Sequence, residues 1–264
     1  MPFPPVKMMS SHRLLISLWL AGVVLEGLLL FRALASGWFK KYPFFFAYLA
    51  SVFVQEFFLL AIYRFRFSYY ARVYWFEEFV SLAMGCGITW EIFRVMLERY
   101  PGAGKMARNV LLIVLSMILS KGLVSAWYRD VPWPTTGIEL EGNLRAIQAL
   151  ALIVLAVLIV YYQIPIGRNI KGIFIGYGLF IATSVVTLTL RGSLGKTFQI
   201  AWVLVQPMCY LTVLFIWCRS LWEYEAAPPA ESQFKIESDY RLLTLATRKG
   251  LIQARTLARK VLRP

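Results

Sequence analysis

Seven long apolar segments dominate the chain, and each is close to the length that a helix needs to cross a lipid bilayer. A hydrocarbon core of roughly 30 Å requires about 20 apolar residues in an α-helix. Because lipid cannot bond to exposed backbone groups, such segments cross it as helices. They cover residues 14–34, 43–63, 74–97, 107–127, 145–162, 172–190 and 198–218. The sequence therefore predicts an all-α, integral membrane bundle of seven transmembrane helices.

The composition is that of a membrane protein. Hydrophobic residues make up 59% of the 264 residues and charged residues 16%, whereas soluble domains have about 45–50% and about 25%. The net charge of +14 is explained by basic residues at helix ends and cytoplasmic loops, where they meet anionic lipid headgroups. The lipid bilayer and its headgroups are thus the expected partners, and nucleic acid is not.

The connectors divide the chain into four parts. Most links between spans are short, which makes neighbouring helices antiparallel. Only the stretch 128–144 is long, and its Pro132, Pro134 and Gly137 predict an irregular loop. We expect an N-terminal segment (1–13), the seven-helix bundle (14–219), a linker (220–237) and a basic tail (238–264).

The first span imitates a secretory signal peptide. Lys7 and Arg13 precede it, and small residues around Ala35 resemble a cleavage site. However, its apolar run is longer than a signal core, and it contains Glu26 and Arg32. These features favour an uncleaved helix, whereas cleavage would leave six spans.

The end of the chain fixes the expected orientation. From Tyr240 onward there are seven basic residues and no acidic one. Since positive charge favours the cytoplasmic side and seven spans place the termini on opposite sides, we expect the N-terminus outside and the C-terminus in the cytoplasm.

The tail has the pattern of an amphipathic basic helix that begins near Ser238. Apolar residues recur at three- and four-residue steps, with basic residues opposite them. Its natural place is the anionic membrane surface, and the groove of a partner protein is the alternative. The residues expected to contact lipid or a partner are Arg241, Arg248, Lys249, Arg255, Arg259 and Lys260.

Ionisable residues inside the spans are the first candidates for function, because their insertion is costly and they usually face a partner or a watery cavity. They are Glu26, Glu56, Glu77, Glu78, Glu91 and Lys121. One interpretation is an outward cavity in which Glu56 and Lys121 form an ion pair that a ligand or proton breaks. In the other, Lys121 reaches the membrane interface and the glutamates pair with arginines at the helix ends.

Two further patterns concern helix ends and kinks. Glu91, Arg94 and Glu98 share one helix face, either as a solvated helix end or as a lock to another helix. On the seventh span, Pro207 predicts a kink that admits Gln206 or water to the centre of the bundle.

Small residues four positions apart predict close helix contacts. Gly172 and Gly176 form such a pair on the sixth span, and Ala83 and Gly87 form another on the third. They serve either packing within the bundle, which we favour, or a homo-oligomer.

No familiar catalytic or metal-binding set is present. His12 is the only histidine, and Cys86, Cys209 and Cys218 lie in or beside apolar runs. The sequence therefore predicts neither a metal nor a cofactor, and it gives no catalytic residues.

The run YWFEEFVSLAMGCGITWEIFRVML at residues 74–97 and the Pro-x-x-Tyr segment at Pro207 resemble uncharacterised multi-pass membrane proteins of environmental bacteria such as acidobacteria. The resemblance implies a bacterial inner membrane.

Three functions follow as hypotheses. The first is a non-enzymatic sensor, accessory or scaffold subunit that is coupled to lipid or protein through its basic tail. The second is a small proton-coupled transporter that uses Glu56 and Lys121. The third is a membrane enzyme acting on lipid.

Overall fold

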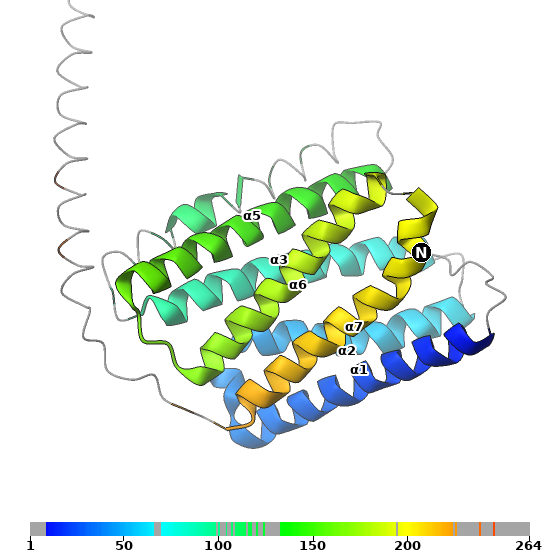
Figure 1. Ribbon diagram of the computed structural model, residues 1–264, viewed down its shortest axis with the longest axis horizontal. Helices are drawn as coiled ribbons and strands as arrows, with labels where there is room; N and C mark the ends of the chain where they lie inside the picture. Colours follow the sequence, from blue (N-terminus) through cyan, green and yellow to red (C-terminus); the bar gives the residue numbers. More distant parts are fainter. Residues whose placement is uncertain are drawn as a thin grey trace, which may run out of the picture.

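Among the residues that it describes, the computed structural model has six long helices and one short 3-10 helix. It describes residues 9–65, 70–98, 133–193 and 195–223, together with isolated residues in 100–124 and residues 225, 238 and 245. The long helices are α1 (Met9–Ser36), α2 (Pro43–Phe65), α3 (Tyr70–Met96), α5 (Trp133–Tyr162), α6 (Arg168–Ser193) and α7 (Gly195–Leu221), and the 3-10 helix η1 is Trp38–Lys40 (Figure 1). Residues 109–114 are also helical. The prediction of an all-α chain is confirmed for these described residues.

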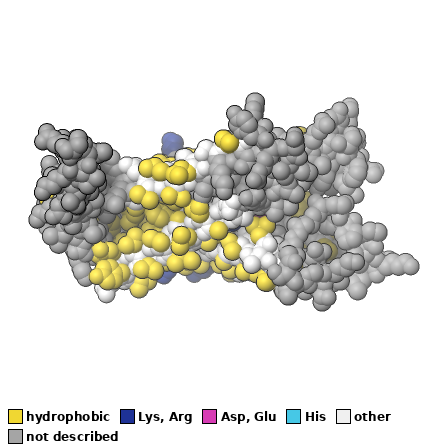
Figure 2. Space-filling model, turned by 90° about the horizontal axis from the view of Figure 1, so that it is seen from above, with side chains coloured by type: hydrophobic (Ala, Val, Ile, Leu, Met, Phe, Trp, Pro, Cys, Tyr) yellow, Lys and Arg dark blue, Asp and Glu magenta, His cyan; other side chains and the backbone are white. Residues whose placement is uncertain are grey.

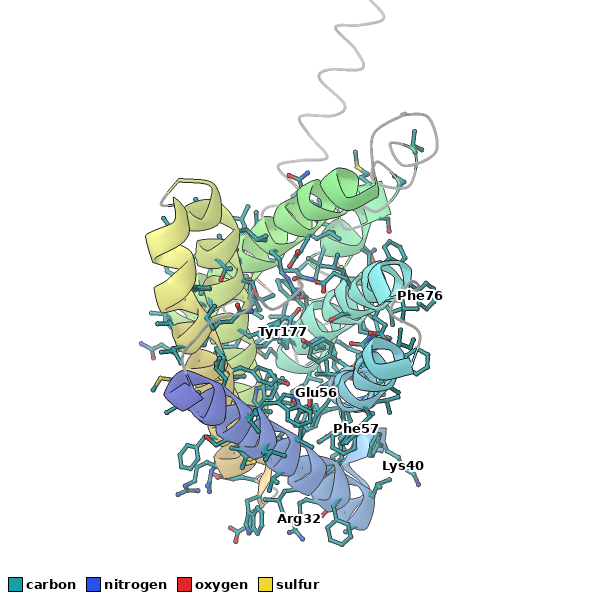
Figure 3. The ribbon with its side chains drawn as sticks, turned by 90° about the vertical axis from the view of Figure 1, so that its right-hand side faces the viewer. Arg32, Lys40, Glu56, Phe57, Phe76 and Tyr177 are labelled. Atoms are coloured by element: carbon teal, nitrogen blue, oxygen red, sulfur yellow. The ribbon has the colours of Figure 1, made fainter. Side chains whose placement is uncertain are left out.

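The six long helices form a closed ring. α1 packs on α2, α2 on α3, α3 on α5, α5 on α6 and α6 on α7, and α7 returns to contact α1 (Figures 1 and 3). α3 also contacts α6 across the ring. Side chains on the inner faces of these helices therefore meet in a shared interior, although they come from distant parts of the sequence.

Five of these helices are long and apolar enough to cross a membrane. The candidate spans are Leu14–Ser36, Phe76–Met96, Glu141–Tyr162, Arg168–Leu190 and Trp202–Leu221. α2 contributes the shorter apolar helix Pro43–Phe58, and the fourth predicted span lies mostly outside the described residues. Of the seven predicted spans, the described part of the chain thus provides five.

The outer surface of the ring is apolar, as lipid contact requires. Large side chains such as Phe31, Val157 and Val160 are exposed, and Figure 2 shows a described face covered mostly by hydrophobic side chains. This agrees with a membrane protein.

One predicted loop is wrong. The stretch 128–144 was expected to be irregular, yet α5 begins at Trp133 and continues through Glu141. Pro134 lies in the first turn, where a helix has no use for the missing N–H group, so proline there does not break it. As a result Arg145, expected at the start of a span, lies well inside α5.

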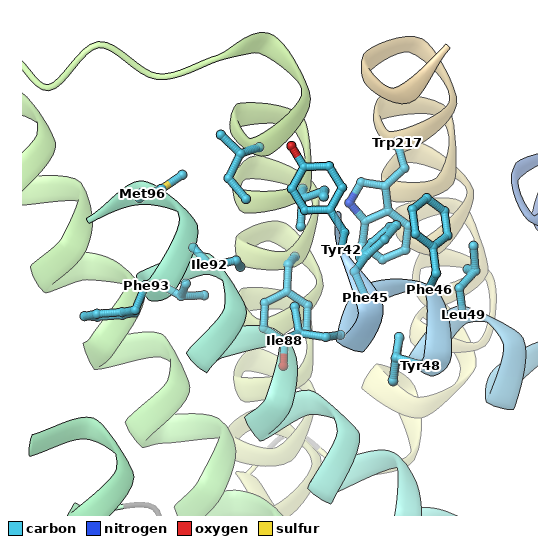
Figure 4. Close-up of a cluster of buried hydrophobic side chains, with 14 of the residues drawn as sticks. Tyr42, Phe45, Phe46, Tyr48, Leu49, Ile88, Ile92, Phe93, Met96 and Trp217 are labelled. Atoms are coloured by element: carbon cyan, nitrogen blue, oxygen red, sulfur yellow. The ribbon is translucent and has the colours of Figure 1, made fainter. Parts of the chain in front are cut away.

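The aromatic core lies toward one end of the ring. Phe45 on α2 and Trp217 on α7 are fully buried, and their rings meet edge to face with centroids 4.9 Å apart. Tyr42 and Phe46 extend this cluster, with Ile92 of α3 nearby (Figure 4). At this end of the bundle the ends of α1, α3 and α7 meet the starts of α2 and α6.

The glycine pair on α6 is used inside the bundle. A β-carbon on Gly172 would lie 2.1 Å from Cβ of Ser220, and one on Gly176 would lie 2.3 Å from Nε1 of Trp217. Both glycines therefore let α6 and α7 approach closely. On α3 only one member of the predicted pair acts this way, since Gly87 faces Phe44 while Ala83 is exposed.

Candidate functional site

A polar cluster lies in the interior of the ring, where α3, α5 and α6 meet. A β-carbon added to Gly85 on α3 would lie 2.8 Å from Oη of Tyr177, 3.3 Å from Nε2 of Gln148 and 3.8 Å from Nη1 of Arg145. Tyr177 and Gln148 are completely buried, and Arg145 is 3% exposed. Figure 3 shows Tyr177 inside the ring. We call these four residues the Arg145 centre.

The hydrogen bonds within the Arg145 centre leave several atoms unused. The Tyr177 hydroxyl donates to the carbonyl oxygen of Gly85 at 2.9 Å, and Nε2 of Gln148 donates to Sγ of Cys86 at 3.5 Å. Nε and Nη1 of Arg145 and Oε1 of Gln148 have no hydrogen-bond partner in the described structure. Buried polar groups are normally paired, so this concentration of unpaired atoms marks the centre as a candidate binding site.

The guanidinium of Arg145 has one ion-pair partner and several more distant electrostatic neighbours among the described residues. Oε1 of Glu141 lies 3.8 Å from its Nε, which is beyond hydrogen-bond distance. Its guanidinium carbon lies 5.0 Å from the ring centroid of Phe180, a cation–π contact. Tyr48 and Glu78 lie within electrostatic range. A guanidinium keeps its proton in proteins, so a positive charge is held inside the bundle.

A second polar cluster joins α1 to α7. Oη of Tyr210 donates a hydrogen bond of 2.5 Å to Oε1 of Glu26, whose side chain is completely buried. Trp19 of α1 lies close to the carboxyl group of Glu56 on α2, and Glu56 in turn lies within electrostatic range of Glu26. Oε2 of both glutamates has no partner in the described structure. Two carboxyl groups from different helices thus share one apolar region beside Tyr210.

A cavity lies against this cluster, between α6 and α7. It is partly open and has a volume of about 90 Å³, room for water molecules, and its surface is more apolar than polar. The lining residues are Phe180, Thr183, Ser184, Thr187, Gln206, Cys209, Tyr210 and Val213. Gln206 lines this cavity but is itself exposed, so it does not lie at the bundle centre. Pro207 lies within α7 without ending the helix.

Glu91 on α3 holds the first turn of α2. Its two carboxylate oxygens accept hydrogen bonds from the backbone N–H groups of Phe44, at 3.2 Å, and Phe45, at 2.9 Å. Nη2 of Arg94 lies 3.7 Å from Oε1. The free N–H groups and positive dipole end of a helix favour a carboxylate. Of the two interpretations of this motif, a link between helices describes the geometry at Glu91, while Glu98 is exposed.

Carbonyl groups at the end of α7 and just after it accept hydrogen bonds from side chains of two other helices. Nε and Nη2 of Arg32, on α1, donate to the carbonyl oxygen of Trp222 at 3.2 and 3.0 Å. Nδ2 of Asn169, on α6, donates to the carbonyl oxygens of Ser220, at 2.7 Å, and Glu223, at 2.6 Å. These bonds satisfy helix-end acceptors that have no partner within the helix.

The remaining predicted residues are Glu77, Glu78, Lys121 and the basic residues of the tail, and the described structure does not gather them into one site. Glu77 is 8% exposed with Oε2 unpartnered, and Glu78 lies toward Arg145. Lys121 and the basic residues of the tail lie outside the described residues, so the Glu56–Lys121 pair stays a prediction. Reasoning from the sequence missed Arg145, Gln148 and Tyr177, whose common location depends on tertiary packing.

No protein-family model matches the chain, and neither a curated protein nor a solved structure matches it. Among the described residues, no group of three or more His, Cys, Asp or Glu side chains is arranged to hold a metal ion.

Proposed function

We propose that this chain is a non-enzymatic membrane subunit, a sensor or an accessory protein, that couples the state of its helical bundle to a lipid or protein partner. In this proposal it has seven spans in a bacterial inner membrane, with its N-terminus outside. The basic tail lies in the cytoplasm and makes the contact. The apolar surface of the ring and the basic residues after Tyr240 support this arrangement.

The observation that carries the proposal is the bonding of α7, the last helix before the tail. In its middle, Tyr210 bonds to Glu26 of α1. At its end, Asn169 of α6 binds the carbonyl oxygen of Ser220, and Arg32 of α1 binds that of Trp222, just after the helix. A change in the polar interior therefore shifts α7 relative to two neighbours, and the linker transmits that shift to the tail.

Deletion of residues 238–264 tests the role of the tail. The expected result is a bundle that still inserts and unfolds with an unchanged midpoint in nanodiscs, because no bond of the ring described above involves these residues. Loss of the folded bundle on deletion would contradict a separate coupling segment.

Protease protection tests the partner of the tail. We expect a nonspecific protease to cleave the tail more slowly in nanodiscs with anionic lipid than in neutral ones. Replacement of Arg241, Arg248, Lys249, Arg255, Arg259 and Lys260 by glutamine should remove that difference. Equal cleavage rates of the unmodified protein in both lipids would exclude the membrane surface and leave a protein partner.

A proton-coupled transporter is the second candidate, favoured by the interior carboxyl groups of Glu26 and Glu56 and by Tyr210, which bonds Glu26 and lines the cavity. Such groups inside a membrane commonly belong to proton relays. Here Glu56→Gln should abolish proton-driven uptake in proteoliposomes, with Glu98→Gln as an exposed control. Uptake that is absent in the unmodified protein, or unchanged by Glu56→Gln, would exclude this function.

A further inference from the structure

We propose that the cavity between α6 and α7 binds a short-chain alcohol, a small uncharged molecule with one hydroxyl group on an apolar body. The inference goes beyond the proposed function, which names no ligand for the interior of the bundle. Three properties of the cavity support it: its place in the membrane-spanning helices, its unused polar groups and its apolar walls.

The cavity lies within two candidate membrane spans. Its residues on α6 belong to Arg168–Leu190, and its residues on α7 belong to Trp202–Leu221. None of the described residues that line it is charged. Because a charge is costly inside a bilayer and this lining has none to offset it, the ligand should be uncharged. A cavity of about 150 Å³ can hold benzene, so the volume of about 90 Å³ admits a molecule of a few carbon atoms.

Gln206 offers a side-chain amide on the α7 side of the cavity. It lies on the same face of α7 as Tyr210 and Val213, yet it is exposed whereas Val213 is buried. No hydrogen bond joins its amide to another described residue. Since hydrocarbon offers no hydrogen-bonding partner, an amide at this depth gains from a ligand that bonds to it.

The α6 side of the cavity offers acceptors. Thr183 and Ser184 donate their hydroxyl hydrogens to backbone carbonyl oxygens one turn earlier in α6, both at 2.9 Å. Their donors are therefore used, while their oxygen atoms can still accept. The hydroxyl of Tyr210 already donates to Glu26. An alcohol suits both sides, because its single hydroxyl can donate to an oxygen of α6 and accept from Nε2 of Gln206.

The remaining walls suit an apolar body. The surface of the cavity is more apolar than polar, and Phe180 and Val213 are among its apolar residues. The ring centroid of Phe180 lies 6.3 Å from that of Tyr210, and the guanidinium carbon of Arg145 lies 5.0 Å from the Phe180 ring centroid. A ligand against this ring therefore lies beside side chains that reach both polar clusters of the bundle.

Cys209 provides a reporter in the cavity, and Cys218 provides an internal control. Both are half-buried on α7, but Cys209 lines the cavity, whereas Cys218 faces the carbonyl oxygen of Leu25. The unmodified full chain in nanodiscs is treated with methyl methanethiosulfonate, a small neutral thiol reagent, and each cysteine is followed by mass spectrometry. We expect 1-butanol to slow the modification of Cys209 several-fold and to leave that of Cys218 unchanged.

Three results would overturn the proposal. A rate at Cys209 that does not depend on butanol would mean that the cavity holds water only. Equal slowing at both cysteines would mean that the alcohol acts through the bilayer. A Cys209 thiol that does not react at all would mean that the cavity is closed to small molecules.

A comparison with 1-chlorobutane tests the role of the hydroxyl group. This compound has the same apolar body without a hydroxyl, so it should protect Cys209 less than butanol does in the unmodified protein. Gln206→Leu should remove that difference, whereas Thr212→Val, an exposed position of α7 outside the lining, should keep it. Equal protection by the two compounds in the unmodified protein would contradict recognition of an alcohol. The protease protection of the tail is measured separately, so failure here leaves the proposed function standing.

Discussion

Tyr210 on α7 donates a 2.5 Å hydrogen bond to Glu26 on α1, across 184 positions of sequence. The bond joins the first and last helices of the ring through two polar side chains in an apolar surrounding. It also places the phenol between a buried carboxyl group and the cavity that contains Gln206. Tyr210 is therefore where the interior of the bundle and the helix leading to the tail are most directly connected.

Tyr210→Phe should destabilise the bundle. The substitution keeps the ring and removes the only hydroxyl that bonds Glu26 among the described residues. Hydrogen bonds between helices in membranes contribute about 0.6–2 kcal/mol, so we expect a loss of about 1 kcal/mol in equilibrium unfolding in mixed micelles. Thr212→Val, at an exposed position of the same helix, is the control and should change little. Equal effects of the two variants would mean that the bond contributes nothing specific.

Gly176→Ala and Gly178→Ala form a matched pair on α6. The first places a methyl group 2.3 Å from Nε1 of Trp217, whereas the second meets nothing within 4 Å. Overpacking costs about 1–3 kcal/mol, while alanine in place of an unconstrained helical glycine stabilises by up to about 1 kcal/mol. The two changes should therefore have opposite signs in thermal unfolding. A change of oligomeric state, with unchanged stability, would instead assign this glycine to a homo-oligomer.

Glu91→Ala should loosen the start of α2. It leaves the N–H groups of Phe44 and Phe45 without their carboxylate acceptor, at an expected cost of about 2–4 kcal/mol. Glu91→Gln retains one acceptor oxygen and should lose roughly half as much, since a hydrogen bond to a neutral group is the weaker kind. Hydrogen exchange at the amide groups of residues 44–46 is the direct measurement. Glu98→Gln serves as the exposed control. Exchange that is equally fast in all three variants would show that the Glu91 carboxylate does not stabilise the first turn of α2.

Much of the helical framework could be predicted from the sequence because apolar runs of bilayer length have few other solutions. The predicted spans 14–34, 74–97, 172–190 and 198–218 lie within α1, α3, α6 and α7 apart from one residue at the end of α3. The start of α5 could not be predicted, because Pro132, Pro134 and Gly137 are ordinary loop residues that here precede or begin a helix.

The interior was harder to predict than the helices. Glu26 and Glu91 were identified as acidic residues inside the spans, but their partners, Tyr210 and the start of α2, lie far away in sequence. Arg145 was missed because the late predicted start of its span placed it at a membrane boundary, where an arginine needs no partner. Which residues meet in the interior depends on how the helices pair, and the hydropathy of the sequence does not determine that pairing.

Asn169→Ala should release the end of α7. It removes the bonds to the carbonyl oxygens of Ser220 and Glu223 and the bond that Oδ1 accepts from the N–H of Glu225. Each such bond contributes about 0.5–1.5 kcal/mol net, so a loss of about 1–3 kcal/mol is expected. Lys171→Ala, two positions along α6 and exposed, should lie within about 0.5 kcal/mol of the unmodified protein. An Asn169→Ala protein as stable as this control would show that the stability of α7 does not depend on the hydrogen bonds of Asn169.

The coupling of the bundle to the tail is tested most directly by the rate at which a nonspecific protease cleaves residues 238–264 in nanodiscs with anionic lipid. The measurement compares the unmodified protein, Tyr210→Phe and the control Thr212→Val, with the bundle folded in all three. If α7 transmits the state of the interior, Tyr210→Phe should change the cleavage rate of the tail several-fold while Thr212→Val leaves it unchanged. Identical cleavage rates in all three proteins would contradict coupling through α7.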